Sequence, residues 1–300
     1  MRVFVTGATG YIGSAVVREL LTAGHDVLGL ARSDTAASAL TRAGATAHRG
    51  DIEDLDSLRA GTAAADGVVY AANKHISDTT DSAQRAKVEL TAVETIGTGL
   101  TGTGKPFVVT SGVIGRTPGH LLTEDTPTIP NPLTALRLPV ERSVLAMADH
   151  GVRASSLRLA PTVHGEGDSR GFVSLLIATA RRTGVSAHVG DGSNRWSAVH
   201  RHDAATLFRL ALESAPAGTS LHAVAEEGVP FKDIAAAIAH KLTLPTASLT
   251  TEEAPAHFGF LAPLVALDNP TSSALTRARF TWRPTGPDLI ADIHSGHYFA

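Results

Sequence analysis

The chain has 300 residues, no cysteine, a formal net charge of −3 and a pI near 6.5. This balance gives no electrostatic footprint for nucleic acid or an anionic membrane, and the lack of cysteine excludes disulfides, thiolate metal sites and a cysteine nucleophile. With 43% hydrophobic and 18% charged residues, and no apolar run near the ~20 residues of a membrane helix, we expect a globular, cytoplasmic protein.

Residues 1–30 have the pattern of a β-α-β unit. An apolar strand, MRVFVTG, precedes the segment GATGYIG (residues 7–13), a helix that ends near Gly24 and a second strand, HDVLGLAR. Gly7 permits a tight turn, Gly10 lets the backbone approach a pyrophosphate, and Gly13 allows close helix–strand packing. The helix N-terminus favours the anion. The expected dinucleotide-binding residues here are Gly7, Thr9, Gly10, Tyr11, Ile12 and Gly13.

The residue at the end of the second strand distinguishes the two nicotinamide cofactors. An acid there hydrogen-bonds the ribose 2′-hydroxyl of NAD, whereas a basic residue accommodates the 2′-phosphate of NADP. Arg32 occupies this position, and its planar guanidinium suits a phosphate. Asp34 follows two residues later. The sequence therefore favours NADP(H), with NAD(H) as the alternative.

Strands and helices continue to alternate along the chain. Four more strands are expected in ATAHRGD, DGVVYAA, KPFVVTS and GVRASSLRLAP, with a helix over 81–101. The alternation predicts an α/β protein with a Rossmann-type doubly wound parallel sheet over 1–165. A smaller substrate-binding lobe is expected over 166–300, packed on the first domain and interleaved with it. The polar, proline-bearing residues 116–132 predict a loop over the cleft.

The lobe is expected to contain several helices. GFVSLLIATARRTG and VPFKDIAAAIAHKL have helical patterns, and FTWRPTGPDLIADI contains a short final helix. NRWSAVHRHDAATLFRLALESA predicts a strand followed by a helix capped at Asp203. His200 and His202 would alternate on that strand and face opposite ways, so no metal site is expected.

The segment TGATGYIG resembles the short-chain dehydrogenase/reductase superfamily, in its extended and atypical branches, which include NAD-dependent epimerase/dehydratase proteins and NADPH-dependent carbonyl reductases. LRLAPTVHGEGD and GDGSNRWSAVHRHDAA resemble later segments of extended members. The resemblance implies that Asp51 and Ile52 contact the adenine ring of the cofactor. It implies further cofactor contacts by Ala71, Ala72, Asn73, Thr110, Arg137 and Pro161.

In this superfamily a tyrosine gives its proton to the substrate carbonyl. A lysine four residues later lowers the tyrosine pKa and binds the nicotinamide ribose. Residues i and i+4 share a helix face, so both side chains reach one cleft. Many extended members also have an acidic residue four positions after the lysine. Glu141 fits this residue, which places Leu133 at the position of the tyrosine and Arg137 at that of the lysine. Leu133 cannot donate a proton, whereas Arg137 can keep the ribose and electrostatic roles. Ser111, or Thr110 before it, is expected to orient the carbonyl.

Another group must then supply the proton. His164 lies where extended members often have the tyrosine of VYG, and histidine is a competent acid near neutral pH. His75 is the second candidate and an expected substrate contact, and a water held by Ser111 is a third route. Arg195 and Trp196 are expected to form a substrate wall for an acidic or aromatic ligand.

The expected function is an NADP(H)-dependent oxidoreductase that transfers hydride to a small carbonyl-type substrate, with a nonstandard proton donor. Two alternatives remain open: a nucleotide-sugar-type epimerase or isomerase that retains its cofactor, and a non-catalytic protein that senses NADP(H). The expected partner is a small-molecule substrate, without nucleic acid or membrane. A homodimer is compatible with such folds.

Overall fold

The structure is a computed structural model that describes residues 1–72, 81–117 and 119–299. The strands are β1 Arg2–Thr6, β2 Asp26–Ala31, β3 Thr46–Arg49, β4 Gly67–Tyr70, β5 Pro106–Gly112, β6 Arg153–Leu159, β7 Thr162–His164, β8 Ser186–Val189, β9 Arg195–His200, β10 Thr219–Ala223, β11 Glu226–Pro230 and β12 Thr246–Leu249. The α-helices are α1 Tyr11–Thr22, α2 Asp34–Arg42, α3 Leu55–Ala63, α4 Ser82–Leu100, α5 Leu138–Ala146, α6 Phe172–Thr183, α7 Arg201–Ser214, α8 Phe231–Leu242, α9 Ala254–Phe258, α10 Ala262–Val265, α11 Ala274–Phe280 and α12 Leu289–Ser295. Short 3₁₀ helices occupy Met147–His150, Gly259–Leu261 and His297–Phe299.

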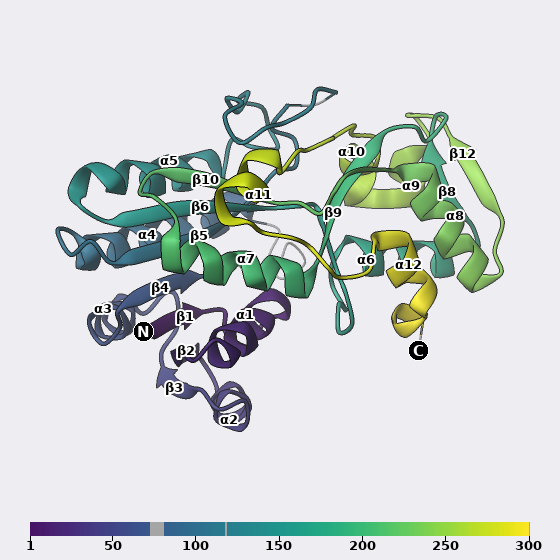
Figure 1. Cartoon of the computed structure of the whole chain (residues 1–300). Coiled ribbons are helices and arrows are strands. Elements are labelled where there is room, and N and C mark those ends of the chain that lie inside the picture. The colour runs from purple at the N-terminus through teal and green to yellow at the C-terminus, as the bar shows by residue number, and fades with distance from the viewer. Residues whose placement is uncertain (73–80, 118, 300) are drawn as a thin grey trace.

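Seven strands form one parallel sheet in the order β10-β6-β5-β4-β1-β2-β3 (Figure 1). This confirms the predicted α/β class and the Rossmann-type parallel sheet. The strand order reverses between β1 and β4, so the crevice at the carboxyl ends of these two strands is where such sheets bind ligands.

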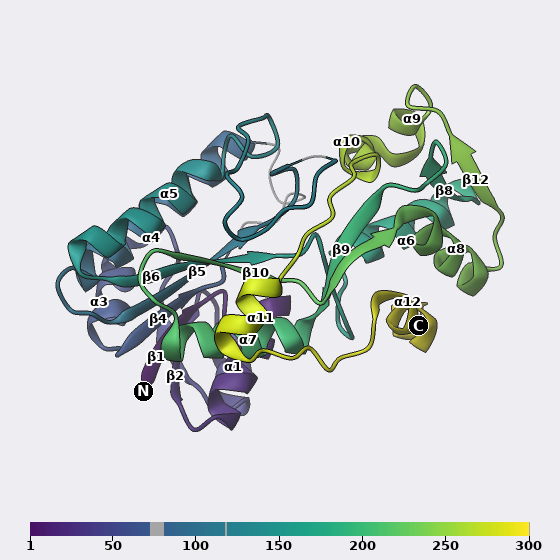
Figure 2. The ribbon, with the colours of Figure 1, turned by 45° about the horizontal axis from the view of Figure 1, so that its top comes forward.

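Helices cover both faces of this sheet, with α1 and α7 on one face and α3, α4 and α5 on the other (Figure 2). Alternate residues of each strand supply the two hydrophobic layers. In β1, for example, Val3 and Val5 pack with α1 and α7, whereas Phe4 packs with α3 and α4. Because helices cover both faces of the sheet, its polar side chains can contact a ligand only at the ends of the strands.

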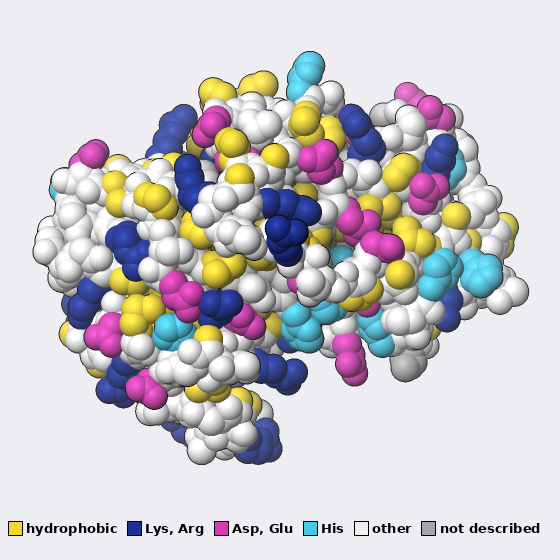
Figure 3. All heavy atoms as spheres, in the orientation of Figure 1, with side chains coloured by type: hydrophobic (Ala, Val, Ile, Leu, Met, Phe, Trp, Pro, Cys, Tyr) yellow, Lys and Arg dark blue, Asp and Glu magenta, His cyan; other side chains and the backbone are white. Residues whose placement is uncertain are grey.

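The second unit is built on two small sheets, β11-β9-β7 and β12-β8. Helices α6, α8, α9, α10 and α12 surround them, and the shared core includes Trp196, Phe231 and Phe258. The chain does not divide cleanly at residue 165. Strand β10 belongs to the Rossmann sheet, α7 packs on that sheet, and α11 packs against α7 and β10. Acidic and basic side chains are interspersed over the face seen in Figure 3. Within the described ranges no helix is both long and apolar enough to cross a bilayer.

Two predictions about the lobe were wrong. Asp203 does not cap α7 but lies in its first turn, where its carboxylate accepts hydrogen bonds of 2.9 Å from the backbone N–H groups of Thr285 and Gly286. His202 lies on α7 rather than on the strand, so its ring meets that of His200 edge-on, with 5.0 Å between centroids. Both errors have one cause: α7 begins at Arg201, with His200 as its N-cap, three residues earlier than a helix capped at Asp203 would.

Candidate active site

The glycine loop joins β1 to α1 at the carboxyl edge of the sheet. Gly7 has φ +65°, and a Cβ there would lie 2.7 Å from the backbone of Ala71 and Ala72 at the end of β4. A Cβ on Gly13 would lie 2.0 Å from the carbonyl oxygen of Gly7. Gly10 is exposed, as is Thr9, and no side chain caps α1. The loop therefore presents unpaired helix N–H groups that fit a pyrophosphate.

The residues after β2 include one basic and one acidic side chain, Arg32 and Asp34, that could contact the ribose of a bound dinucleotide. Arg32 is exposed directly after the strand and makes no ion pair with any residue that the structure describes. Ser33 caps α2 by accepting a 3.2 Å hydrogen bond from Ala36 N–H. Asp34 is the first residue of α2 and is paired with Arg49, the last residue of β3. Asp34 thus has an ion-pair partner, whereas Arg32 has none among the described residues.

The remaining expected cofactor contacts follow the carboxyl edge. Ala71 and Ala72 are half-buried after β4, and Ala72 N–H donates to Thr6 Oγ1 at 3.3 Å. Half-buried residues also follow β3 and β6 at Asp51, Ile52 and Pro161. Asn73 and His75 lie outside the described residues. The expected contacts that can be placed thus surround the crevice between β1 and β4 or the strands beside it.

Ser111 is connected to a buried ionic network that the sequence analysis did not predict. Its Oγ accepts a 3.0 Å hydrogen bond from Arg116 Nη2, and Arg116 Nη1 lies 2.6 Å from Glu141 Oε2. Arg158 Nε donates to Glu141 Oε1 at 2.8 Å. Burial would raise the pKa of Glu141, but the two arginines hold it below its usual range, so the carboxyl stays ionised. In the sequence, Arg116 is the first residue of a segment with the pattern of a polar loop. Its burial could have been inferred only by recognising that Glu141, if buried, would need a cationic partner.

Leu133 and Arg137 lie in a turn that leads into α5 rather than on the helix itself. Leu133 is 41% exposed, and its Cβ lies 3.0 Å from the place of a Cβ on Gly115. Arg137 Nη2 donates to Glu89 Oε1 at 2.5 Å and to the carbonyl oxygen of Thr110 at 3.1 Å. Arg137 is thus at the end of β5, where a ribose hydroxyl would compete with Glu89 for its donors.

A tyrosine and a lysine four residues apart do occur elsewhere in the chain, at Tyr70 and Lys74. Tyr70 is the last residue of β4 and has no exposed surface, and burial raises the pKa of its hydroxyl. Lys74 lies outside the described residues. Tyr70 faces the hydrophobic layer under α4, so its position is that of a core residue.

His164 is enclosed at the end of β7. It has no exposed surface, its Nδ1 lies 2.9 Å from Asp292 Oδ2, and its ring meets that of His200 at 5.5 Å. The adjacent Gly165 is held from both sides, since its carbonyl oxygen accepts from the Tyr11 hydroxyl and its N–H donates to Tyr298, each at 3.1 Å. In this conformation a substrate cannot reach the His164 ring.

Arg201 is a second side chain that sequence reasoning missed. Its guanidinium lies 4.6 Å from the centre of the Tyr11 ring and donates to Ser14 Oγ at 3.1 Å. This places a positive charge beside the first turn of α1. A single arginine at the start of a helix 190 residues later carried no signal of that contact.

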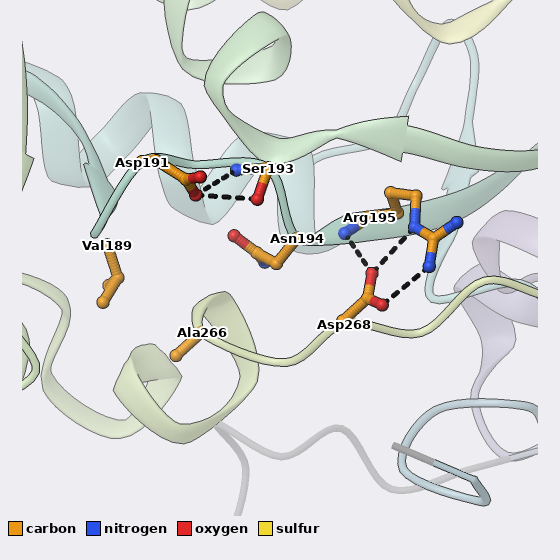
Figure 4. A pocket seen from close by; sticks show the side chains of 7 residues that line it. All are labelled: Val189, Asp191, Ser193, Asn194, Arg195, Ala266 and Asp268. Atoms are coloured by element: carbon orange, nitrogen blue, oxygen red, sulfur yellow. Dashed lines mark hydrogen bonds and ion pairs between the residues drawn. The ribbon is translucent and has the colours of Figure 1, made fainter. Parts of the chain in front are cut away.

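The lobe contains an open hollow of about 420 Å³, lined by Val189, Asp191, Ser193, Asn194, Arg195, Ala266 and Asp268 (Figure 4). The Arg195 side chain is one of the lining residues and is bound to Asp268. Trp196 lies in the lobe core instead, 1% exposed, with its indole N–H donating to the carbonyl oxygen of Leu264 at 3.2 Å. No group of three or more histidine, aspartate or glutamate side chains in the described parts of the chain is placed to hold a metal ion.

This arrangement can be compared with known proteins. The model of the NAD dependent epimerase/dehydratase family matches residues 3–224. The chain belongs to this family. The match confirms the predicted resemblance and extends from β1 through β10, so it includes β7, β8 and β9 of the lobe as well as the Rossmann sheet.

Two relatives of this family member align over nearly its whole length. The uncharacterized protein C2A9.02 of Schizosaccharomyces pombe is 48% identical over 299 residues, which cover 100% of both chains. The UDP-glucose 4-epimerase of Streptomyces lividans is 27% identical and covers 98% of this chain and 96% of its own. Among solved structures, the Thermus thermophilus UDP-glucose 4-epimerase in complex with NAD has a TM-score of 0.78 at 22% identity, with 99% of each chain covered.

Proposed function

We propose that this member of the epimerase/dehydratase family is an NADP(H)-dependent oxidoreductase that reduces a small carbonyl-type substrate. The observation that carries the proposal is the contrast after β2, where Arg32 is exposed and available while Asp34 is paired with Arg49. A guanidinium is well suited to a 2′-phosphate, and a basic residue at the end of the second strand is the arrangement that accommodates one.

The chain's own residues divide the binding work along the crevice. The glycine loop and the first N–H groups of α1 would hold the pyrophosphate, and Arg32 the 2′-phosphate. Asp51 and Ile52 would line the adenine, whereas Ala71, Ala72, Pro161 and Arg137 would border the nicotinamide side. Asn73 is proposed beside them on the resemblance alone.

Bound NADPH would supply a hydride to the carbonyl carbon. Ser111 is proposed to orient the carbonyl, because Arg116 donates to its Oγ and leaves the hydroxyl hydrogen free to point at a substrate oxygen. As the carbonyl becomes an alkoxide, its oxygen would take that proton while a water molecule gives a proton to Ser111 Oγ, and the hydroxide left behind would be neutralised by solvent. Thr110 is less suited, since its hydroxyl already donates to the carbonyl oxygen of Tyr70 at 2.8 Å. The enclosure of His164 argues against it as the acid, and His75 remains a prediction.

The test is oxidation of NADPH and of NADH over a panel of aldehydes, ketones, imines and activated alkenes. We expect kcat/KM with NADPH to exceed that with NADH by about 100-fold, and Arg32→Asp to reverse the preference, because a carboxylate would repel the 2′-phosphate. Arg42→Asp, on the exposed end of α2, makes the same charge change away from the site and should leave the preference unchanged. A wild-type preference for NADH would overturn the cofactor assignment.

The similarity to UDP-glucose 4-epimerases favours one other function, an epimerase that retains its cofactor. Such an enzyme would convert a sugar nucleotide without net loss of NADPH absorbance. Tight NADPH binding without turnover of any kind would instead indicate a sensor. Cytoplasmic location and a homodimer stay predictions.

A further inference from the structure

Four acceptors surround the buried guanidinium of Arg116, and Ser111 is one of them. Nε donates to the carbonyl oxygen of Gly112 at 2.6 Å, and Nη2 donates to Ser111 Oγ at 3.0 Å. Nη1 contacts Thr128 Oγ1 and, at 2.6 Å, Glu141 Oε2. Because acceptors hold all three nitrogens, the planar guanidinium keeps one orientation and gives the Ser111 oxygen a fixed donor.

The backbone of Arg116 is held by the far end of the loop over residues 116–132. Its carbonyl oxygen accepts a hydrogen bond of 3.1 Å from Ile129 N–H. Thr128, whose hydroxyl accepts from the guanidinium, directly precedes Ile129. The start and the end of the loop therefore fix the side chain that reaches Ser111.

One carboxylate serves two positive charges in this network. Glu141 Oε2 binds Arg116, and Glu141 Oε1 accepts from Arg158 Nε at 2.8 Å. The next buried carboxylate, Glu124, instead accepts from the backbone N–H and the hydroxyl of Thr276, at 2.7 and 2.6 Å. The two arginines and Glu141 together thus carry a formal charge of +1 beside the carboxyl end of β5.

We propose that Arg116 is a positioning residue for the reduction: it orients the Ser111 hydroxyl toward the substrate oxygen, and its charge stabilises the alkoxide that forms there. The inference rests on the proposed function, because it needs a carbonyl that reacts beside Ser111. The N–H donated by Arg116 draws electron density from Ser111 Oγ, which favours transfer of the hydroxyl proton. In that step hydride adds to the carbonyl carbon, the carbonyl oxygen takes the Ser111 proton, and water reprotonates Ser111, so Arg116 gives up no hydrogen.

The Ser111–Arg116 pair would replace the tyrosine and lysine that the chain lacks at their usual positions. Leu133 has no proton to give, and Arg137 is bound to Glu89. In the superfamily a cation favours proton transfer from a hydroxyl that contacts the substrate. Here Ser111 supplies the hydroxyl and Arg116 supplies the cation, from a loop rather than from a helix.

The experiment is a single turnover of NADPH bound to the full chain, started with a saturating concentration of the carbonyl compound that the wild type reduces fastest. The rate constant reports the hydride step, whereas the amplitude reports the fraction of folded, NADPH-bound protein. We expect Arg116→Gln to lower the rate constant at least about tenfold. Arg116→Lys keeps a cation for Glu141 and so protects the fold. One ammonium cannot bond Glu141 and Ser111 as the guanidinium does, so we expect a loss of at least about fivefold.

Arg158→Gln is the matched control, because it removes the other cation of Glu141 and leaves Ser111 untouched. Its amplitude should fall as that of Arg116→Gln does, while its rate constant stays within about threefold of the wild type. The double variant Ser111→Ala/Arg116→Gln should be no more than about threefold slower than Ser111→Ala, since Arg116 acts through Ser111.

Wild-type rate constants in both Arg116 variants, or the full Arg116 loss on top of that of Ser111→Ala, would overturn the inference while the proposed function stands. An equal loss of rate in Arg158→Gln would also overturn it, because Arg116 would then act only through the stability of the fold. A wild type that oxidises NADPH with no carbonyl compound would overturn the proposed function itself, and the inference with it.

Discussion

The proposed cofactor end and the proposed reaction end of the same sheet use their polar groups in opposite ways. Around β1 and β2, Thr9, Gly10 and Arg32 are exposed and face solvent. Around β5, Ser111 and Arg137 are bound to side chains of the protein itself, through Arg116 and Glu89. A binding site for a large anionic cofactor must leave donors open, whereas groups that act on one carbonyl need fixed positions. Three experiments test whether the closed network serves that purpose.

The largest expected effect comes from Glu141→Gln, which keeps the side-chain volume but leaves Arg116 and Arg158 buried without a carboxylate. Removing one member of a buried ion pair costs about 3–5 kcal/mol, so we expect the free energy of unfolding in urea to fall by that amount. The NADPH affinity of the folded fraction should stay within about twofold, because the glycine loop lies on other strands.

Glu94→Gln is the matched control on the neighbouring helix. Glu94 is exposed and contacts Ser143 at 3.4 Å, so its loss should cost less than about 0.5 kcal/mol. Equal stabilities of the two variants would contradict a structural role for the network.

Ser111→Ala is expected to lower kcat by about 100-fold with little change in NADPH affinity, since it removes the proposed donor to the carbonyl oxygen. Arg116 keeps its bond to Glu141 in this variant, so stability should change by less than about 1 kcal/mol. Steady-state rates and NADPH fluorescence titration measure the two effects. The companion His164→Gln should keep kcat within about threefold, and a loss as large as that of Ser111→Ala would restore His164 as the acid.

The smallest expected effect is a pH dependence of stability at His222. Its Nδ1 lies 2.7 Å from the carbonyl oxygen of Ser272 and its Nε2 lies 3.2 Å from Arg158 Nη1, an arrangement that fits a neutral ring. Burial, with the Arg158 charge, lowers its pKa from 6.5 to about 4. The folded state then binds fewer protons than the unfolded state, so this stabilisation is full above pH 6.5 and is lost as the pH falls toward 4.

Between pH 6.5 and 5.0 the loss from His222 should reach about 2 kcal/mol, measured by urea unfolding at each pH. His222→Gln should be less stable at neutral pH but show a flatter profile over this interval. His120→Gln, on an exposed residue, should retain the wild-type slope. An unchanged slope in His222→Gln would show that the ring titrates normally.

The sequence allowed the β1–α1–β2 unit to be predicted because its signals are local. The glycine spacing, the short apolar strand and Arg32 lie within about thirty residues, and each expresses one backbone or charge requirement. Arg116 and Asp268 gave no such signal, since their partners Glu141 and Arg195 lie 25 and 73 residues away. Long-range pairs form only when the sheet and the lobe are assembled, so no periodicity in the sequence encodes them. The same reason explains why β10, a short strand late in the chain, was not predicted.

The position of β10 also constrains how the protein is made. This strand pairs with β6 along five residues and forms one edge of the seven-stranded sheet, where α7 packs against it. The first strand of that sheet in the chain begins at Arg2. During synthesis the first six strands leave the ribosome more than fifty residues before the seventh, and β6 is meanwhile an unpaired edge. Native completion of the cofactor-binding sheet must therefore wait until the middle of the lobe has been translated.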